Sequence, residues 1–465
     1  MSATATTTDL YALSADDVKE PPATFRARLR HLGPGMILSA AVVGSGELIL
    51  TTSLGARAGF ALLWLIIVAT TVKVWVQLEL GRLTVLYGRP ALEAFSDVKP
   101  RTRRGGWINF LWIGMDFAKM FQRGGIIGGT AAACSVLWPI AGAPLSWTST
   151  AVWSLIIVAV TVALLQSSRY SVVETASVIA VAVFTLITVA LALALPFTEF
   201  GWTPGDLASG LELAVPVGAL GMAVAMFGLT GVGADEMTTY TYWCMEKGYA
   251  RWTGPADGTP ERDRRAVGWL KVMRLDVAVS WLVCTLCTLS FYVIGASVLH
   301  PQQLVPEGND MITTLSRMYT DTLGPWAEVL FLLGAIAVLF STIIGSTASV
   351  PRLWTNTLGI LGVLDWKNPE VRKRTIRILT YCLPPLWAAS YLFVQSPVLM
   401  VQIGGFGGGV FLVAVVIAVW YLRAHEPDKH LRPHPLVTAA LILSSLAIAA
   451  LGVYSALEVF GIEIS

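Results

Sequence analysis

The chain has 465 residues, of which 55% are hydrophobic and only 13% are charged, and its formal net charge is +2. Because soluble proteins carry about 25% charged residues, this composition excludes a soluble globular protein. The small net charge gives no indication of a nucleic-acid partner. Apolar runs of about 20 residues recur throughout the chain, and each is long enough to cross a bilayer. We therefore expect an all-α integral membrane protein whose main partner is the lipid bilayer.

The chain begins with a polar stretch, residues 1–30, which is rich in Ser, Thr and Ala. It contains no apolar core before the first span, so it does not resemble a cleavable signal peptide. We expect residues 1–30 to be a disordered cytoplasmic tail. Residues 31–465 are then a single transmembrane domain, because no polar stretch within them is long enough to form a separate soluble domain.

The apolar runs predict eleven transmembrane helices. They lie near residues 34–56, 61–87, 107–139, 150–166, 171–196, 214–245, 267–299, 325–348, 376–394, 398–422 and 435–458. If the N-terminus is cytoplasmic, the segments on the inside hold 23 Lys or Arg residues and those on the outside hold only Arg57 and Arg317. This asymmetry predicts a multi-pass protein of the cell membrane with a cytoplasmic N-terminus and an extracytoplasmic C-terminus.

One local pattern, Val-Gly-x-x-Glu, occurs at Val43–Glu47 in span one and again at Val232–Glu236 in span six. The two sites occupy the same place in successive groups of five helices. Five is odd, so the second group must be inverted relative to the first. We expect an inverted 5+5 repeat, with one repeat at about 34–196, the other at about 214–422 and an extra helix at about 435–458. Such repeats with broken first helices are typical of secondary transporters, which bind substrate at the breaks.

The breaks carry three acids, Glu47, Asp235 and Glu236. Each intramembrane acid costs about 2.5–3.5 kcal/mol on insertion scales, so their charges must be offset. In one interpretation they are cation ligands, with the backbone carbonyls of Gly44 and Gly233 in support. In the other, Glu47 and Glu236 cap the second half-helices. The sequence leaves both interpretations open.

Span three carries Asp116, Lys119 and Arg123 on one helical face, where they can pair with one another. Alternatively, the two cations neutralise the acids at the breaks in the empty state, or they bind an anionic group of a substrate. In span two, Lys73 and Glu79 are interpreted as lying near the helix ends or snorkelling toward the membrane surface.

The stretch HLGPGMILSAAVVGSGELIL resembles the first span of the Nramp (natural resistance-associated macrophage protein) divalent-metal transporters, in which Gly-Pro-Gly precedes an Asp-Pro-Gly-Asn motif. In this alignment the motif falls on residues 44–47. The family's Met-Pro-His in span six falls on residues 233–235. STIIGS, residues 341–346, and RYSVVE, residues 169–174, are similar to family segments in spans eight and five, and Gln402 lies where the family has a glutamine that lines the site. The resemblance implies a LeuT-like fold.

Of the family's metal-binding side chains, the Asp, Asn, Met and His are replaced at the aligned positions. The replacements leave carboxylates, carbonyls, hydroxyls and Gln402, an oxygen donor set that suits Mg²⁺ or Mn²⁺. By analogy with the proton route in the family's third span, Asp116 is a candidate relay, and Glu174 is a second candidate. Ser341 and Thr342 are candidates for a Na⁺ site, since LeuT-like transporters often bind Na⁺ at span-eight hydroxyls.

The sequence favours a secondary transporter of a hard divalent cation that works by alternating access, with H⁺ or Na⁺ as candidate coupling ions. The alternative is an H⁺- or Na⁺-coupled transporter of a small anionic or zwitterionic organic solute on the same fold. A non-transporting receptor is a third hypothesis. No enzyme motif is present, and we expect no permanently bound cofactor. A monomer is expected, and a dimer is the alternative.

Overall fold

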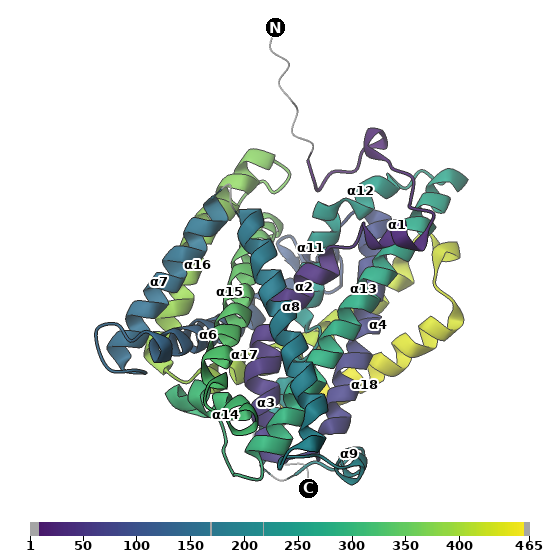
Figure 1. Cartoon of the computed structure of the whole chain (residues 1–465). Coiled ribbons are helices and arrows are strands. Elements are labelled where there is room, and N and C mark those ends of the chain that lie inside the picture. The colour runs from purple at the N-terminus through teal and green to yellow at the C-terminus, as the bar shows by residue number, and fades with distance from the viewer. Residues whose placement is uncertain (1–8, 168–169, 217, 460–465) are drawn as a thin grey trace.

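The computed structural model describes residues 9–167, 170–216 and 218–459, which form a bundle of long helices (Figure 1). The long helices and those that build the site are α2 (Pro34–Val42), α3 (Thr52–Ala58), α4 (Leu63–Tyr87), α6 (Trp107–Leu137), α7 (Trp147–Gln166), α8 (Tyr170–Ala194), α10 (Leu220–Leu229), α11 (Ala234–Lys247), α13 (Pro260–Ile294), α15 (Ala327–Ile360), α16 (Pro369–Val394), α17 (Pro397–His425) and α18 (Pro435–Val459). The short helices are α1 (Phe25–Leu29), α5 (Ala91–Phe95), α9 (Pro204–Ser209), α12 (Tyr249–Thr253) and α14 (Met311–Leu323), and a two-stranded ribbon joins β1 (Arg101–Thr102) to β2 (Gly105–Gly106).

Helices occur at each of the eleven predicted spans. Among the described residues, seven helices are long and apolar enough to cross a membrane on their own. The remaining four spans depart from a plain apolar helix for identifiable reasons. Spans one and six change conformation midway, α6 carries three charged residues in its middle, and α16 carries four basic residues among its first nine.

The loops that the charge asymmetry placed on one side gather at one end of the bundle. In Figure 1, α1 and α12 lie at one end, whereas α9 and α14 lie at the opposite end. α14 is amphipathic and turns Met311, Leu315 and Met318 inward. The cytoplasmic identity of the first end remains a prediction.

The sequence predicts a break in span one, but the structure shows a continuous helix there. Between α2 and α3 the chain stays helical, but residues Val43–Thr51 widen into a π-helix. The hydroxyl of Thr51 donates to the carbonyl of Gly46 at 2.9 Å, and that of Thr52 donates to the carbonyl of Glu47 at 3.2 Å. These side chains stabilise carbonyls whose ordinary α-helical bond is lost in the wider turn. The expected break is therefore a local change of helix type.

Span six is broken, as predicted. α10 ends at Leu229 and α11 begins at Ala234, so four residues between them are not helical. Gly231 adopts a positive φ of 68°, a conformation that glycine adopts without steric cost. Gly228, in the last turn of α10, lies so close to the backbone of α17 that a side chain there would meet the Gly405 carbonyl. α10 is therefore held against α17 immediately before the break.

The core positions both altered spans. α6 packs against α15, α16 and α17, and α4 packs against α13 and α18. A buried cluster of charges fixes α4 to α17 near one end. Arg82 pairs with Glu79 and with Glu426, at 2.6 Å in each case, and Arg423 reaches Glu79 at 2.8 Å. Because each buried charge has opposite partners, the cluster tolerates its loss of hydration and holds α4 in register.

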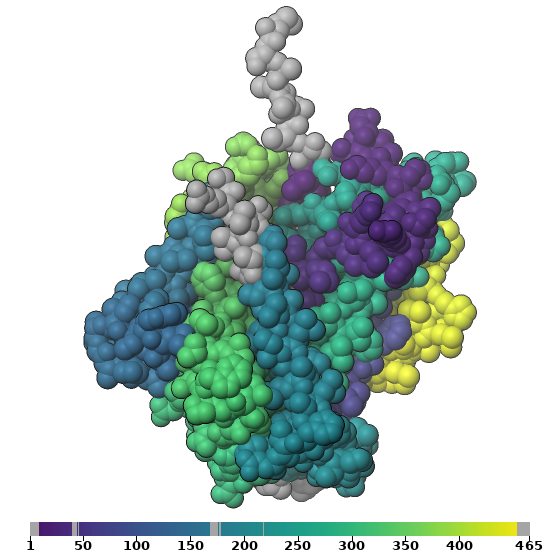
Figure 2. Space-filling view, viewed as in Figure 1, coloured from purple at the N-terminus to yellow at the C-terminus, as the bar shows by residue number. Residues whose placement is uncertain are grey.

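The described part of the N-terminal segment is packed, so the prediction of a disordered tail is wrong for residues 9–30. Asp9 pairs with Arg372, and the Tyr11 hydroxyl donates to Glu246 at 2.6 Å. Lys19 donates its backbone N–H to the Trp252 carbonyl at 3.1 Å. In Figure 2 these residues, in purple, spread over one end of the molecule. Their binding comes from scattered anchor residues rather than from an apolar run, which explains why the composition suggested disorder.

Candidate functional site

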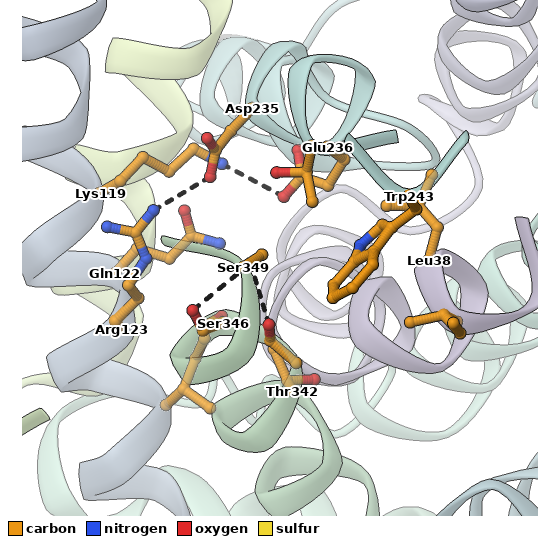
Figure 3. Close-up of a pocket in the computed structure, with 14 residues that line it drawn as sticks. Leu38, Lys119, Gln122, Arg123, Asp235, Glu236, Trp243, Thr342, Ser346 and Ser349 are labelled. Carbon is orange, nitrogen blue, oxygen red and sulfur yellow. Dashed lines mark hydrogen bonds and ion pairs between the residues drawn. The ribbon is translucent and has the colours of Figure 1, made fainter. Parts of the chain in front are cut away.

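A cavity lies where four helices meet, beside the start of α11 (Figure 3). It is lined by Ile37 and Leu38 of α2, Lys119, Gln122, Arg123 and Ile126 of α6, Asp235, Glu236, Thr239 and Trp243 of α11, and Thr342, Gly345, Ser346 and Ser349 of α15. The centres of water-sized molecules can occupy about 40 Å³ of it. That volume holds a few water molecules or a hydrated ion in this conformation, but not a large organic molecule.

Arg123 joins two acids across the cavity wall. Its guanidinium lies 2.7 Å from Asp116 on the same helix and 3.0 Å from Asp235 on α11. Asp116 also accepts the indole N–H of Trp354 at 2.6 Å. The seven-residue spacing of Asp116 and Arg123 places them on one face of α6, as the sequence predicts. Their pairing is confirmed, and the contact with Asp235 agrees with the alternative in which the cations of span three neutralise the acids at the breaks.

Lys119 makes the second cross-link to α11. Its ammonium lies 3.5 Å from Glu236 Oε1 (Figure 3). Both acids stand in the first turn of α11, where exposed backbone amides and the helix dipole favour negative charge. Asp235 Oδ1 and Glu236 Oε2 are buried and have no hydrogen-bond partner among the described residues. Buried carboxylate oxygens without partners are costly, so the two acids that line the cavity have acceptors to offer to a cation.

The opposite wall supplies neutral oxygens. Thr342, Ser346 and Ser349 of α15 face the cavity, and the Thr342 hydroxyl donates to the carbonyl of Val338 at 3.2 Å. Trp243 of α11 also lines the cavity (Figure 3). Arg352 lies over its ring at 5.1 Å and pairs with Glu246 at 2.7 Å. An aromatic and ionic cluster therefore adjoins the cavity at Trp243.

Glu47 does not face this cavity. It is fully buried, and its Oε1 accepts the backbone N–H of Gly231 at 3.2 Å and the Thr288 hydroxyl at 3.1 Å. Its Oε2 has no hydrogen-bond partner in the part of the chain that the structure describes. The repeated pattern suggested that Glu47 and Asp235 share one ligand set. This arrangement does not support that expectation, because Glu47 caps a backbone amide in the break of span six instead.

Lys73 is the residue whose position the sequence interpretation missed. It is neither near a helix end nor snorkelling, but is fully buried in the middle of α4. Its ammonium donates to the carbonyl of Phe227 at 2.7 Å and to that of Thr230. A lysine that follows fifteen uncharged residues within an apolar run is the only sequence signal for this position, because its acceptors are backbone atoms far along the chain.

The other predicted site residues divide between the cavity and its surroundings. Thr342 lines the cavity, whereas Ser341, Gly44, Gly233 and Gln402 are described by the structure but are not among the lining residues. Gly44 nevertheless packs against Thr342, and Gly233 packs against the Glu236 carboxylate. Glu174 lies outside the residues whose side chains are described. In residues 9–167, 170–216 and 218–459, no group of three or more His, Cys, Asp or Glu side chains is arranged to hold a metal ion.

Comparison with known proteins places the chain among membrane transporters. The family model described as natural resistance-associated macrophage protein-like, or Nramp, matches residues 35–458. The divalent metal cation transporter MntH of Deinococcus radiodurans is 25% identical over 363 residues, which cover 77% of this chain and 74% of that protein.

The fold is also found among solved structures. A manganese transporter of Eremococcus coleocola matches with a TM-score of 0.55 and 15% identity, covering 97% of this chain and 100% of that one. Mhp1, a nucleobase-cation-symport-1 family transporter, matches with a TM-score of 0.54 and 15% identity, covering 91% of this chain and 89% of that one. These likenesses show the LeuT-like fold, which confirms the predicted fold class.

Proposed function

Because the chain belongs to the Nramp family, we propose that it is a secondary transporter of a divalent cation, favouring hard ions such as Mn²⁺ or Mg²⁺, and that it works by alternating access. The names of two similar proteins support the substrate class. The relative from Deinococcus radiodurans is a divalent metal cation transporter, and the structural neighbour from Eremococcus coleocola is a manganese transporter. The Asp116–Arg123 pair is a candidate route for a coupling proton.

The observation that carries the proposal is a pair of buried oxygens without hydrogen-bond partners among the described residues, Asp235 Oδ1 and Glu236 Oε2, on two acids that line the cavity. Two carboxylates on consecutive residues at the start of a half-helix offer hard ligands to an ion. The Thr342 and Ser346 hydroxyls across the cavity can hold water molecules that the ion retains. Mg²⁺ and Mn²⁺ suit such a mixed set of oxygens, whereas a site without thioether or imidazole does not favour softer ions.

Lys119 and Arg123 stabilise the ion-free state in which the proposed carrier returns across the membrane. In the ion-free cavity they neutralise Glu236 and Asp235, at 3.5 and 3.0 Å. An arriving divalent ion competes for the same carboxylates, so the two side chains must withdraw as the ion binds. The empty carrier then avoids the cost of two unpaired acids within the membrane. This arrangement predicts weaker ion binding than a cavity without resident cations would show.

The test is Mn²⁺ and Mg²⁺ uptake into proteoliposomes, with direct Mn²⁺ binding to the purified protein. We expect Asp235→Asn to reduce Mn²⁺ affinity by at least about 100-fold, because a charged ligand is lost. Asp310→Asn, an exposed change outside the spans, is the matched control and should behave as wild type. Mn²⁺ binding that survives in Asp235→Asn and in Glu236→Gln would overturn the ligand assignment.

A second candidate substrate is supported by the two cations of the cavity. Lys119 and Arg123 can hold the carboxylate of a small zwitterion while Asp235 and Glu236 hold its ammonium group. Its size would be limited by the small free volume in this conformation. A thermal-shift screen of metals, amino acids and carboxylates separates the two. A shift with an organic zwitterion and none with any divalent metal would replace the first proposal with the second.

A further inference from the structure

The break in span six has separated one specific pair of backbone groups. In a continuous helix, the N–H of Gly231 would donate to the carbonyl of Phe227 four residues earlier. Here the Gly231 N–H turns to Glu47 Oε1 at 3.2 Å, and the Phe227 carbonyl accepts from Lys73 at 2.7 Å. Two charged side chains from other spans therefore replace the lost hydrogen bond. Glu47 of span one accepts from the Gly231 N–H, and Lys73 of span two donates to the Phe227 carbonyl.

The surroundings of the Lys73 ammonium resemble a binding site for a small monovalent cation. The carbonyl oxygens of Phe227 and Thr230 both point at it, from the C-terminal end of α10, where the helix dipole is negative. The Phe227 ring centroid lies 5.1 Å away, within range of a cation–π contact. Glu47 Oε2 has no hydrogen-bond partner among the described residues.

Backbone carbonyls at the end of a half-helix are the ligands with which transporters of this architecture commonly hold coupling ions. We propose that these two carbonyls form a monovalent-cation site that the ammonium of Lys73 permanently fills. A covalently held ammonium stays in place through the transport cycle. The break in span six is then stabilised without any soluble ion, and the transporter needs no Na⁺ or K⁺ at this position.

This inference is independent of the transported substrate. Lys73 and Glu47 are not among the residues that line the cavity, and α4 is fixed separately by its buried ion pairs with α17. A failure of the divalent-cation proposal would leave the Lys73 proposal intact, because the Lys73 proposal is tested by the stability of the protein in monovalent salts rather than by transport.

The experiment removes the ammonium and supplies a substitute. We expect Lys73→Ala to lower the melting temperature in detergent when N-methyl-D-glucamine chloride is the only salt. Methylammonium, Na⁺ or K⁺ chloride at equal ionic strength should restore it in a saturable manner by about 5 °C or more. Wild type and Lys271→Ala, an exposed lysine on α13, should show no difference between these salts.

A second variant keeps the proposal testable if Lys73→Ala does not fold. Lys73→Met fills the space of the lysine stem without a charge, so it should be less stable than wild type and should not respond to any of the cations. A methionine variant as stable as wild type would overturn the proposal, because the carbonyls would then need no cation. An alanine variant that folds and responds to methylammonium no more than wild type does would overturn it equally.

Discussion

In span one, the acid of the Val-Gly-x-x-Glu pattern lies on a π-helical segment and is sealed from the cavity, whereas in span six the same pattern begins a new half-helix and opens onto the cavity. Glu47 is 0% exposed and caps Gly231, while Glu236 is partly exposed and reaches Lys119. The local sequences are alike, so the difference comes from what surrounds them.

The neighbours of each segment explain the difference. In span one, Thr51 and Thr52 lie four and five residues after the pattern, and their hydroxyls donate to the carbonyls of Gly46 and Glu47, so the chain remains helical. In span six, the freed groups before the pattern are satisfied by Lys73 and Glu47 from other spans. A broken helix in a membrane thus depends on partners supplied by its neighbours, and the pattern alone does not decide whether it breaks.

The largest expected effect concerns the close approach that precedes the break. A Cβ at Gly228 would collide with the Gly405 carbonyl and lie 2.8 Å from the backbone nitrogen of Gly409. Both obstacles are backbone atoms, so Gly228→Ala should lower the free energy of unfolding by about 3 kcal/mol or more, or prevent folding. The matching change in span one, Gly46→Ala, meets its nearest atom at 3.7 Å and should be nearly neutral. Denaturant unfolding in detergent measures both, and equal stabilities would contradict the comparison.

The second prediction separates the two acids. Glu47→Gln keeps the shape of the side chain but removes the charge that accepts from Gly231 and Thr288. We expect it to cost about 1.5–3 kcal/mol of stability, the range for hydrogen bonds to charged groups. Its Mn²⁺ affinity should change by less than about threefold, since sites that share no partners act nearly additively. Titration calorimetry with Mn²⁺ on Glu47→Gln and on Asp235→Asn compares the two affinities. A loss of affinity as large as that of Asp235→Asn would place Glu47 among the ligands.

A smaller effect is expected at Gly44, the other glycine of the Val-Gly-x-x-Glu pattern in span one. A Cβ at Gly44 would press on the Thr342 side chain and lie 3.1 Å from the Val338 carbonyl. Since one obstacle is a side chain that can rotate, Gly44→Ala should cost about 1–2 kcal/mol, less than Gly228→Ala. Adding Thr342→Ala should recover part of the loss, which a thermal melt of single and double variants would reveal. If stability does not recover, the close contact between spans one and eight is not the reason why Gly44→Ala is destabilising.

The sequence predicted the spans well because apolar length is a local property, and each of the eleven runs contains helix in the structure. It predicted the pairing of Asp116 with Arg123 for the same reason, since seven residues return to one helix face. It did not predict that Lys73 meets Phe227 or that Glu47 meets Gly231, because these contacts join residues 154 and 184 positions apart. The π-helix was missed as well, because its stabilising hydroxyls resemble any other threonines in a membrane helix.

The smallest expected effect concerns a contact between the N-terminal segment and span six. Tyr11 of the N-terminal segment donates to Glu246 near the end of α11 at 2.6 Å, and its ring lies 6.3 Å from that of Tyr242 on the same helix. Tyr11→Phe keeps the ring contact and removes one hydrogen bond, so it should cost about 1 kcal/mol. Tyr381→Phe, an exposed position on α16, is the matched control and should cost nothing measurable. Hydrogen exchange offers a sharper readout than melting. Faster exchange in the last turns of α11, with no change in α2 and α3, is expected, whereas equal acceleration in both spans would mean that the N-terminal segment supports the whole end of the bundle.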